Sequence, residues 1–475
     1  MGLVTPVTAV PVAQLGRVHF VGVGGAGMSG IARLMLGRGV PVSGSDRAAS
    51  AQLDELARLG ATVRVGHDPA NIDGADTVVT TPSAIGDRNP EIVAARQRGI
   101  TVIPRAAALA SLMLGRQGIA VTGTHGKTTT TSMLTTVLRH CGADPSYVIG
   151  GILAETGDGA GEGAGEAFVV EADESDGSFL NLSPSAAVVT CIEAEHLDNY
   201  ESLDRIQATF AAFAAQIRAG GLLVTCRDDP GATALAAAAA ALPLRVRSYG
   251  ESAGADYRLT GVTSLGMATR LTVTPRGAAP LTLTIGVPGR HNALNAAAAL
   301  AATMELGVPA GAAVAGLEAY RGAQRRMEPK GEADGVRVLD SYAHHPTELA
   351  ADLTAAREVA AGGQVIAVFQ PHLYSRTRFF AQEFGAALGL ADEALVLDVY
   401  AAREDPEPGV TGMIIASAVP GGRARFLPDA SAVPDAITGL AKPGDLVLTM
   451  GAGDVTLLGP AILAALRERG GEAGR

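Results

Sequence analysis

The sequence predicts an α/β protein of about three domains, each built on a mainly parallel sheet, and three observations support this fold class. The chain has 475 residues, which at ~150 residues per domain corresponds to about three domains. Short β-branched runs alternate with helical stretches, and this alternation is typical of a parallel sheet covered by helices. The alternation also restarts twice, near residue 118 and near residue 337.

The first domain is expected over residues 1–115. Its predicted strands are Val18 to Val23, Pro41 to Ser43, Thr62 to Val65 and Asp76 to Thr80. Its predicted helices are Met28 to Arg38 and Ser50 to Leu59.

The second domain is expected over residues 116–323. It starts with a strand over Gly118 to Thr122, a glycine turn and a long helix from Lys127. Alternating residues between Asp256 and Val287 predict antiparallel strands appended to this domain. The glycine-rich stretch Gly157 to Gly165 predicts a flexible loop.

The third domain is expected over residues 324–475, after a boundary near Gly322 to Arg325. Its predicted strands are Val336 to Leu339, Val365 to Phe369, Ala394 to Leu397 and Asp445 to Met450, with helices between them.

Composition and charge narrow the class of protein. Hydrophobic residues make up 47% of the chain and charged residues 18%, which is a globular composition. The formal net charge of −11 argues against generic binding to nucleic acid or to anionic membranes. No apolar run approaches the ~20 residues of a membrane-spanning helix, and the three cysteines show no metal-site spacing. We therefore expect a soluble, cytoplasmic protein.

The first motif, Gly22-Val-Gly-Gly-Ala-Gly, directly follows a predicted strand and opens a predicted helix. Glycines let the backbone approach a diphosphate, and the helix N-terminus supplies amide donors. Asp46 ends the next strand, roughly where a ribose-binding acid lies in dinucleotide folds. The motif alone makes NAD the default ligand; we favour a diphosphate compound of any kind over a turn that binds nothing.

The second motif, Gly123-Thr-His-Gly-Lys-Thr-Thr-Thr, also lies between a strand and a helix and predicts phosphate binding. It differs from a standard Walker A motif because Val121 stands where the first glycine would be. Backbone amides would cradle phosphate oxygens, Lys127 would reach the outer phosphates, and the Thr128 hydroxyl suits Mg²⁺. Lys127 is also the only lysine before Lys330.

Two apolar strands downstream end in acids: Val169-Val-Glu-Ala-Asp-Glu-Ser-Asp-Gly-Ser and Val188-Val-Thr-Cys-Ile-Glu-Ala-Glu-His-Leu-Asp. Carboxylates clustered beside a phosphate loop are suitable ligands for a hard cation. Either strand alone would more often be a solvated strand end. Two of them after a phosphate loop favour a metal–nucleotide site.

Three further polar groups follow. Gly289-Arg-His-Asn-Ala-Leu-Asn places an imidazole and two amides at a helix start, suited to contacts with a base. Asp340-Ser-Tyr-Ala-His-His-Pro and Phe369-Gln-Pro-His-Leu-Tyr-Ser-Arg-Thr-Arg each end a strand, where ligands collect in open α/β sheets. Most of the nine histidines lie in these motifs, which favours a polar active site: His125, His196, His291, His344, His345 and His372.

In this order, the motifs closely resemble those of the Mur ligase family over essentially the whole chain after a short N-terminal extension. The resemblance rests on the Gly22 loop continuing into Met28-Ser-Gly-Ile-Ala, the Gly123 loop, Glu171-Ala-Asp-Glu-Ser-Asp, Gly289-Arg-His-Asn, His344-His-Pro-Thr-Glu and Phe369-Gln-Pro-His. It implies an N-terminal Rossmann-like UDP-sugar domain and a central P-loop ATPase-like domain with added antiparallel strands. It also implies a C-terminal Rossmann-like domain that binds an amino acid.

The resemblance implies ATP-dependent ligation of L-alanine to the carboxylate of UDP-N-acetylmuramate, an early cytoplasmic step of peptidoglycan synthesis, with Mg²⁺ as cofactor. ATP would convert the carboxylate into an acyl phosphate, and the amine of L-alanine would attack it. The first glycine loop would then hold the diphosphate of a UDP-sugar instead of NAD. The protein would be a monomer or a homodimer.

Matching positions imply the roles of individual residues. The resemblance assigns ATP to Gly123, Thr124, His125, Gly126, Lys127, Thr128, Thr129, His291, Asn292, Asn295, Arg326 and Asp340, the last two reaching ATP as the third domain closes. It assigns the metal to Thr128, Glu171 and His196, with Glu174 as a less favoured alternative to Glu171. It assigns the UDP-sugar to Gly22, Gly24, Gly25, Ala26, Gly27, Met28, Asp46 and Ser83. His344, His372 and Arg376 would approach the amino acid and the muramoyl group, and the catalytic residues would be Lys127, His196, Arg326 and His344.

A few positions depart from the family pattern, but not enough to abolish activity, because Lys127, Thr128, Glu171 and His196 remain. Cys191, Glu195 and Leu373 replace a common asparagine, aspartate and arginine. The nearest alternative is a recycling ligase that joins a preformed murein peptide to the same nucleotide sugar. A nicotinamide dehydrogenase would leave the Gly123 loop unexplained, and a catalytically silent regulator would predict loss of Lys127 or the metal ligands.

Overall fold

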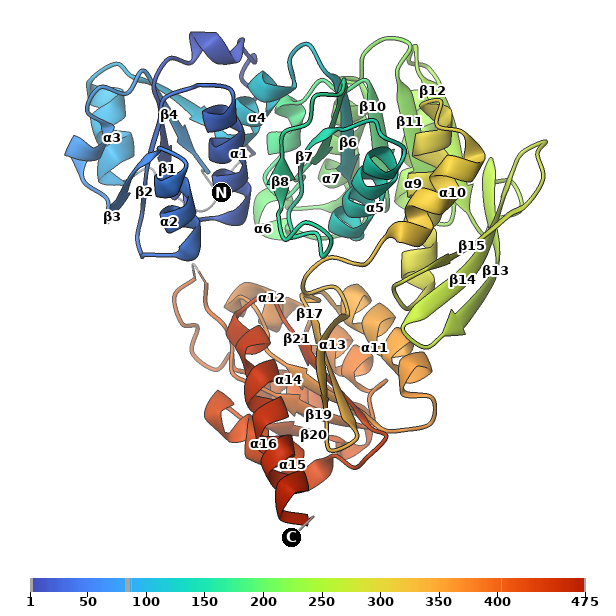
Figure 1. The fold of residues 1–475 in the computed structure, drawn as a ribbon. Coiled ribbons are helices and arrows are strands. Elements are labelled where there is room, and N and C mark those ends of the chain that lie inside the picture. Colours follow the sequence, from blue (N-terminus) through green and yellow to red (C-terminus); the bar gives the residue numbers. More distant parts are fainter. Residues whose placement is uncertain (1–2, 82–85, 87, 403, 474–475) are drawn as a thin grey trace. The chain divides into compact units, whose positions relative to one another are not determined.

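The protein is described by a computed structural model over residues 3–81, 86, 88–402 and 404–473. The chain forms two compact units (Figure 1). The first unit contains the residues up to 260 together with 272–283 and 294–320, and the second contains 261–271, 284–293 and the residues from 321 onward.

The first sheet lies in the first unit and is parallel throughout, with the strand order β3-β2-β1-β4-β5. Its strands are β1 (Val18–Val21), β2 (Val42–Asp46), β3 (Thr62–Val65), β4 (Thr77–Thr80) and β5 (Thr101–Pro104). The accompanying helices are α1 (Ala26–Gly37), α2 (Ala51–Arg58), α3 (Pro90–Gln97) and α4 (Arg105–Met113). The chain order reverses between β1 and β4, and ligands bind at such switch points in open parallel sheets.

The second sheet has the order β15-β14-β13-β12-β11-β10-β6-β9-β7-β8. Its strands are β6 (Gln117–Thr122), β7 (Ser146–Val148), β8 (Ala160–Gly161), β9 (Ala167–Glu171), β10 (Ala186–Val189), β11 (Leu222–Cys226), β12 (Arg245–Gly250), β13 (Tyr257–Leu265), β14 (Ala268–Pro275) and β15 (Leu281–Ile285). Its helices are α5 (Lys127–His140), α6 (Leu197–Tyr200), α7 (Leu203–Ala214), α8 (Pro230–Ala239), α9 (Arg290–Glu305) and α10 (Ala310–Ala319). Two residues, Gly266 and Met267, join β13 to β14, and so short a connection joins antiparallel strands. The predicted antiparallel addition is confirmed.

The glycine-rich stretch from Gly157 to Gly165 differs from the flexible loop that the sequence predicts. Its residues Ala160 and Gly161 form β8, which pairs antiparallel with β7. Arg33 of α1 contacts the Asp158 carboxylate at 2.6 Å, and Arg38 contacts the Glu162 carboxylate at 3.0 Å. Ion pairs from a distant helix thus fix a segment whose composition alone favours flexibility.

The third sheet lies in the second unit and has the order β16-β17-β21-β18-β19-β20. Its strands are β16 (Glu328–Ala333), β17 (Val336–Ser341), β18 (Val365–Phe369), β19 (Glu393–Val396), β20 (Ala424–Phe426) and β21 (Leu446–Met450). Its helices are α11 (Pro346–Ala360), α12 (Tyr374–Phe379), α13 (Ala381–Leu388), α14 (Gly412–Ala418), α15 (Val433–Leu440) and α16 (Leu458–Ala473). Within the described residues of this sheet, β16 pairs antiparallel with β17, and the other neighbouring strands pair in parallel.

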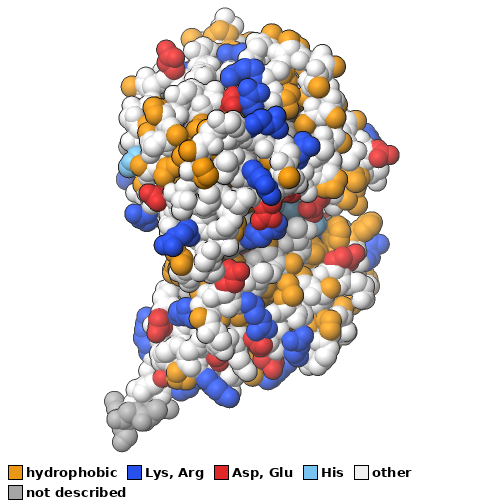
Figure 2. Space-filling model, turned by 90° about the vertical axis from the view of Figure 1, so that its right-hand side faces the viewer, with side chains coloured by type: hydrophobic (Ala, Val, Ile, Leu, Met, Phe, Trp, Pro, Cys, Tyr) orange, Lys and Arg blue, Asp and Glu red, His pale blue; other side chains and the backbone are white. Residues whose placement is uncertain are grey.

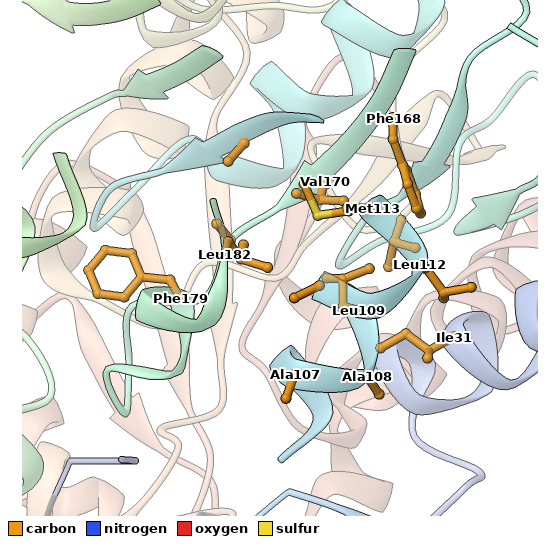
Figure 3. Packing of buried hydrophobic residues seen from close by; sticks show 14 of the residues in the cluster. Ile31, Ala107, Ala108, Leu109, Leu112, Met113, Phe168, Val170, Phe179 and Leu182 are labelled. Atoms are coloured by element: carbon orange, nitrogen blue, oxygen red, sulfur yellow. The ribbon is translucent and has the colours of Figure 1, made fainter. Parts of the chain in front are cut away.

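Helix α4 lies in a hydrophobic core that the two N-terminal sheets share. Residues 106–113 of this helix are all buried. Figure 3 shows Leu109, Leu112 and Met113 of α4 lying between Ile31 of α1 and the side chains of Phe168 and Val170 in β9. Because one core contains residues of both predicted N-terminal domains, they belong to one compact unit; the boundary near residue 115 stays a prediction.

The surface carries charges of both signs. On the face shown in Figure 2, acidic and basic side chains are interspersed, and the hydrophobic side chains form small groups. Within the described parts of the chain, no helix is long and apolar enough to cross a membrane.

Candidate active site

The phosphate-loop motif and both acidic motifs follow neighbouring strands of the second sheet. Strand β6 pairs in parallel with β10 on one side and β9 on the other. The Gly123 loop follows β6, Glu171 ends β9, and the segment leading to His196 follows β10. Because parallel strands end at the same sheet edge, three motifs distant in sequence meet in one place.

Lys127, the first residue of α5, donates inward to its own loop and to a buried acid. Its Nζ lies 2.7 Å from the Gly123 carbonyl oxygen and 2.8 Å from Oε1 of Glu174. Burial alone would lower the pKa of Lys127, but the surrounding carboxylates, led by Glu174, raise it above its ordinary value. Burial raises the pKa of Glu174, whereas the ammonium of Lys127 lowers it and favours the ionised form. Lys127 is therefore protonated and held at the loop by its contact with Glu174. An anionic ligand could take the place of Glu174 as its partner.

Thr128 and Glu171 bring two hard oxygen donors together. The Thr128 hydroxyl donates to Oε1 of Glu171 at 3.1 Å, and the backbone amide of Gly150 donates to Oε2 at 2.7 Å. Oxygen donors of this kind suit Mg²⁺. His196 lies beside other acids, with its Nε2 3.9 Å from Glu174 and 3.8 Å from Glu195. The predicted metal ligands are thus in two groups: Thr128 contacts Glu171, whereas His196 lies beside other acids. Their role as metal ligands stays a prediction.

The phosphate loop has its shape because Gly126 can adopt a left-handed conformation against a close neighbour. Gly126 has φ +79°, and a Cβ there would lie 2.5 Å from Oδ1 of Asn295. Thr130 of α5 donates to the same Oδ1 at 3.2 Å. Asn295, predicted from the sequence to hold the adenine side of ATP, packs against the loop and its helix.

Cys191 supports the other side of the phosphate loop. The amide of His125 donates to its Sγ at 3.3 Å, and the amide of Thr124 donates to its carbonyl oxygen at 2.9 Å. Burial raises the pKa of the Cys191 thiol, so that it stays protonated. The cysteine that departs from the family pattern therefore contacts the backbone of the phosphate loop.

The first glycine loop lies at the carboxyl end of β1 and leads into α1, which begins at Ala26. Asp46, which ends β2, accepts a hydrogen bond from the Gly24 amide at 2.8 Å. The amides of Gly22 and Gly25 donate to the carbonyl oxygens of Ser45 and Gly22. Asp46 thus shapes the loop that the sequence predicts to bind the UDP-sugar. Within that predicted set, Gly27 and the buried Met28 follow in α1, and Ser83 lies outside the described residues.

Arg105 is a residue of this region that the sequence analysis missed. Its Nη2 lies 3.1 Å from Oδ2 of Asp173, within the acidic motif after β9. A Cβ at Gly27 would lie 2.5 Å from its Nη1. No local motif surrounds Arg105, so only the fold reveals that it stands between the glycine loop and the acidic motif.

In the second unit, Asp340 is the second-last residue of β17 and is fully buried. Thr449 and Thr456 donate to its two oxygens at 2.6 and 2.7 Å. Arg325 and Lys330 lie 3.5 and 3.9 Å from Oδ2. The sequence predicts that Asp340 contacts ATP; in this conformation its oxygens are instead engaged within the third sheet and its flanking segments.

A cationic and aromatic group lies at the carboxyl ends of β17 and β18. The Nδ1 of His344 is 3.3 Å from Glu348, and Nη1 of Arg326 is 3.9 Å from the same carboxylate. The His344 and His372 rings lie 6.1 Å apart, and the Arg326 guanidinium is 5.5 Å from the Tyr342 ring. The structure therefore brings together three predicted residues. The fourth, Arg376, lies on α12.

His291 and Asn292 lie at the start of α9, within the second unit. Nε2 of His291 is 3.5 Å from Oδ1 of Asp352 on α11, and Nδ2 of Asn292 donates to the Pro288 carbonyl at 2.7 Å. Burial lowers the pKa of His291, which favours a neutral imidazole. The contact of these residues with a base stays a prediction.

The arrangement can bind phosphates at one sheet edge and neutralise the charge that develops during phosphoryl transfer. Positioning and electrostatic stabilisation supply most of the catalysis in reactions of this type. A second loop of the same unit, the first glycine loop, has the form that suits a diphosphate, and its binding role stays a prediction. The two loops would hold two nucleotides on one core.

Comparison with protein families covers most of the chain. Residues 17–117 match the model described as Mur ligase family, catalytic domain. Residues 121–303 match the Mur ligase middle domain, and residues 325–453 match the Mur ligase glutamate ligase domain.

Individual relatives agree with the family models. The UDP-N-acetylmuramate–L-alanine ligase of Thermobifida fusca is 56% identical over 474 residues, covering 98% of this chain and 100% of the relative. The enzyme of the same name from Kineococcus radiotolerans is 55% identical over 462 residues, covering 96% and 98%. The crystal structure of UDP-N-acetylmuramate–alanine ligase from Thermotoga maritima has a TM-score of 0.81 and 30% identity, covering 95% of this chain and 99% of that one. A murein peptide ligase from Psychrobacter arcticus has a TM-score of 0.70 and 25% identity, covering 95% and 99%. With three matching domain models and full-length relatives at this identity, the chain belongs to the Mur ligase family.

Proposed function

We propose that the protein joins L-alanine to the carboxylate of UDP-N-acetylmuramate in an ATP-dependent reaction. The observation that carries this proposal is the phosphate loop after β6, where Lys127 contacts Glu174 and Thr128 contacts Glu171. Full-length similarity to ligases of that name supports the choice of substrates. Because ATP and UDP-sugars are cytoplasmic metabolites, we also propose a cytoplasmic reaction.

In the first step, a carboxylate oxygen of the muramoyl group attacks the γ-phosphorus of ATP. The bond from that phosphorus to the β–γ bridging oxygen breaks, and ADP leaves with the electron pair. Lys127 exchanges a contact with Glu174 or a loop carbonyl for the phosphate oxygens, where its charge offsets the developing negative charge. A carboxylate is a poor acyl donor, and its conversion into an acyl phosphate supplies a leaving group.

Mg²⁺ is part of the proposal because the donors present suit it. Thr128 and Glu171 would hold it, with His196 nearby, and the ion would neutralise phosphate charge. Glu174 is better suited to storing Lys127, because its Oε1 lies 2.8 Å from the lysine Nζ and its side chain is only 4% exposed.

In the second step, the amine of L-alanine attacks the carbonyl carbon of the acyl phosphate. The tetrahedral adduct expels inorganic phosphate, and the nitrogen loses a proton as the amide forms. We assign contacts with the amino acid and the muramoyl group to His344, His372 and Arg376 in the second unit, where the rings of His344 and His372 lie 6.1 Å apart. Asp340 positions Arg325 and Lys330 in that unit.

The recycling ligase is the less supported alternative. Three relatives that carry the L-alanine ligase name are 54–56% identical to this chain over nearly its full length. The murein peptide ligase is 25% identical.

The experiment is phosphate release from ATP with Mg²⁺ and UDP-N-acetylmuramate, measured with each amino acid and with a preformed murein peptide. The proposal predicts L-alanine-dependent release, with UDP-N-acetylmuramoyl-L-alanine identified by mass spectrometry. Release with the peptide alone would replace the proposal by the recycling reaction. The absence of release in every mixture would refute the ligase function.

A further inference from the structure

Arg105 occupies a place where the binding sites proposed for two nucleotides approach each other. One guanidinium nitrogen, Nη2, forms an ion pair with Asp173 at 3.1 Å. The other terminal nitrogen, Nη1, lies against Gly27 so closely that a Cβ there would be 2.5 Å away. Gly27 belongs to the first turn of α1, where backbone amides have no partners within the helix.

The position of the guanidinium is set by a rigid element. Arg105 is the first residue of α4, and every later residue of that helix is buried. Its own side chain remains 25% exposed. The charge is therefore held at the mouth of the glycine loop but stays accessible to a ligand.

Asp173 connects this charge to the phosphate loop. Its Oδ1 accepts a hydrogen bond from the Ser175 amide at 3.0 Å, which fixes the carboxylate in the acidic motif. The next residue along the chain, Glu174, holds Lys127. Arg105 and Lys127 thus contact consecutive acids of one short segment.

We propose that Arg105 is a binding residue for the diphosphate of the nucleotide sugar, and that this ligand replaces Asp173 as its partner. The inference rests on the proposed function, because it requires a diphosphate at the glycine loop. An anion at the first turn of α1 would meet the helix N-terminus and a guanidinium at the same point. Binding of the nucleotide sugar would release Asp173 and change the charge beside Glu174 and Lys127.

This exchange predicts opposite effects for the two partners of one ion pair. Removing the charge of Arg105 removes a contact with the ligand, so affinity falls. Removing the charge of Asp173 eliminates the competitor for the guanidinium, so affinity rises. If the ion pair only stabilised the fold of the unit, both substitutions would remove the same stabilising contact and change the affinity in the same direction.

The test is equilibrium binding of UDP-N-acetylmuramate and of UDP alone, by calorimetry of the full-length protein without ATP or Mg²⁺. The variants are Arg105→Gln, Arg105→Lys and Asp173→Asn, with circular dichroism to verify folding. Arg38→Gln is the matched control, because Arg38 pairs with Glu162 at 3.0 Å within the same unit.

We expect Arg105→Gln to weaken both ligands by roughly ten- to a hundredfold, as loss of a charged hydrogen bond does. Arg105→Lys should lose less affinity than Arg105→Gln. Asp173→Asn should bind both ligands several-fold more tightly, and Arg38→Gln should bind them with the affinity of the unsubstituted protein. Weaker binding by Asp173→Asn, or unchanged binding by a folded Arg105→Gln, would overturn the inference while leaving the proposed function intact. Loss of affinity for UDP-N-acetylmuramate but not for UDP would overturn the assignment to the diphosphate. If the unsubstituted protein bound neither ligand, the proposed function and this inference would both fail.

Discussion

The Nζ of Lys127 lies 2.8 Å from Oε1 of Glu174, a carboxylate whose side chain is only 4% exposed. A buried charge is costly unless it is paired, so each residue keeps the other in place until a better partner arrives. ATP brings phosphate oxygens that can replace one of these contacts. The ion pair therefore holds the ammonium group of Lys127 in a position from which it can reach the nucleotide.

Lys127→Met should lower kcat for ligation by at least about a thousandfold, because it removes the ammonium group that would offset the charge developing on the phosphate oxygens. The measurement is phosphate release at saturating substrates. Lys442→Met is the control, since Lys442 is exposed in the second unit, and it should retain normal turnover. A near-normal rate in Lys127→Met would contradict the assignment of the phosphate loop.

Gly126→Ala should weaken ATP binding by about tenfold or more. Alanine at φ +79° is strained by about 1–2 kcal/mol, and its Cβ would also lie 2.5 Å from Asn295. Adding Asn295→Ala should relieve the steric conflict but neither the strain nor the loss of the predicted Asn295 contact with ATP, so it should restore only part of the affinity measured by calorimetry.

Gly142 provides the control for this prediction. It lies beyond the other end of α5 with φ +78°, and nothing lies within 4 Å of an added Cβ. Gly142→Ala should carry similar backbone strain and bind ATP normally. Equal loss of ATP affinity in both alanine variants would show that the contact with Asn295 is unimportant.

Arg326→Ala should lower kcat more than it weakens UDP-sugar binding. Arg326 lies with Glu348 and Tyr342 in the second unit, whereas the glycine loop lies in the first. We expect kcat to fall by roughly a hundredfold, as for loss of one electrostatic contact to a transition state, and the Kd of UDP-N-acetylmuramate to stay within about twofold. Loss of UDP-sugar affinity with unchanged turnover would refute this role.

The lowered pKa of Glu91 predicts how the stability of the first unit depends on pH. The residue is fully buried, and burial would raise its pKa. The His19 imidazole, with its Nε2 3.6 Å away, and hydrogen bonds from Ser45 and Asn71 lower the pKa from 4.5 to about 2. Because the folded-state pKa is depressed, the stabilisation is present above pH 4.5 and is lost as the pH falls towards 2. Lowering the pKa from 4.5 to about 2 on folding corresponds to about 3 kcal/mol of folding free energy at neutral pH.

Urea unfolding followed by circular dichroism measures this effect. Glu91→Gln should lower the free energy of unfolding at pH 7, and its difference from the unsubstituted protein should shrink below about pH 4. The exposed Glu468 offers a control, and Glu468→Gln should leave the free energy of unfolding unchanged. A difference for Glu91→Gln that stays constant from pH 7 to pH 3 would contradict the depressed pKa.

The sequence predicts the strands that carry the chemistry because their signals are local. Strands β1, β6 and β9 are apolar runs that end in glycine or acidic motifs, and parallel strand ends meet at one edge. The motif residues from Lys127 to Glu174 therefore lie where the sequence analysis expects them. Their binding roles depend on ligands and stay predictions.

Other features could not be predicted because they depend on contacts between distant segments. Arg105 stands in an ordinary helix start, and only the shared core brings it to Asp173. The N-terminal segment gave no signal, yet the Val4 amide donates to the Asp176 carbonyl oxygen and the Val7 amide to Oδ1 of Asn181. Neither contact has a local sequence pattern.

The most direct test of the central claim follows an oxygen atom. UDP-N-acetylmuramate labelled with ¹⁸O in its carboxylate is incubated with the protein, ATP, Mg²⁺ and L-alanine, and the released phosphate is analysed by mass spectrometry. The acyl-phosphate reaction predicts one ¹⁸O atom in the phosphate for every amide formed from a fully labelled carboxylate. Phosphate without the label, or label transfer without an L-alanine amide, would contradict the account.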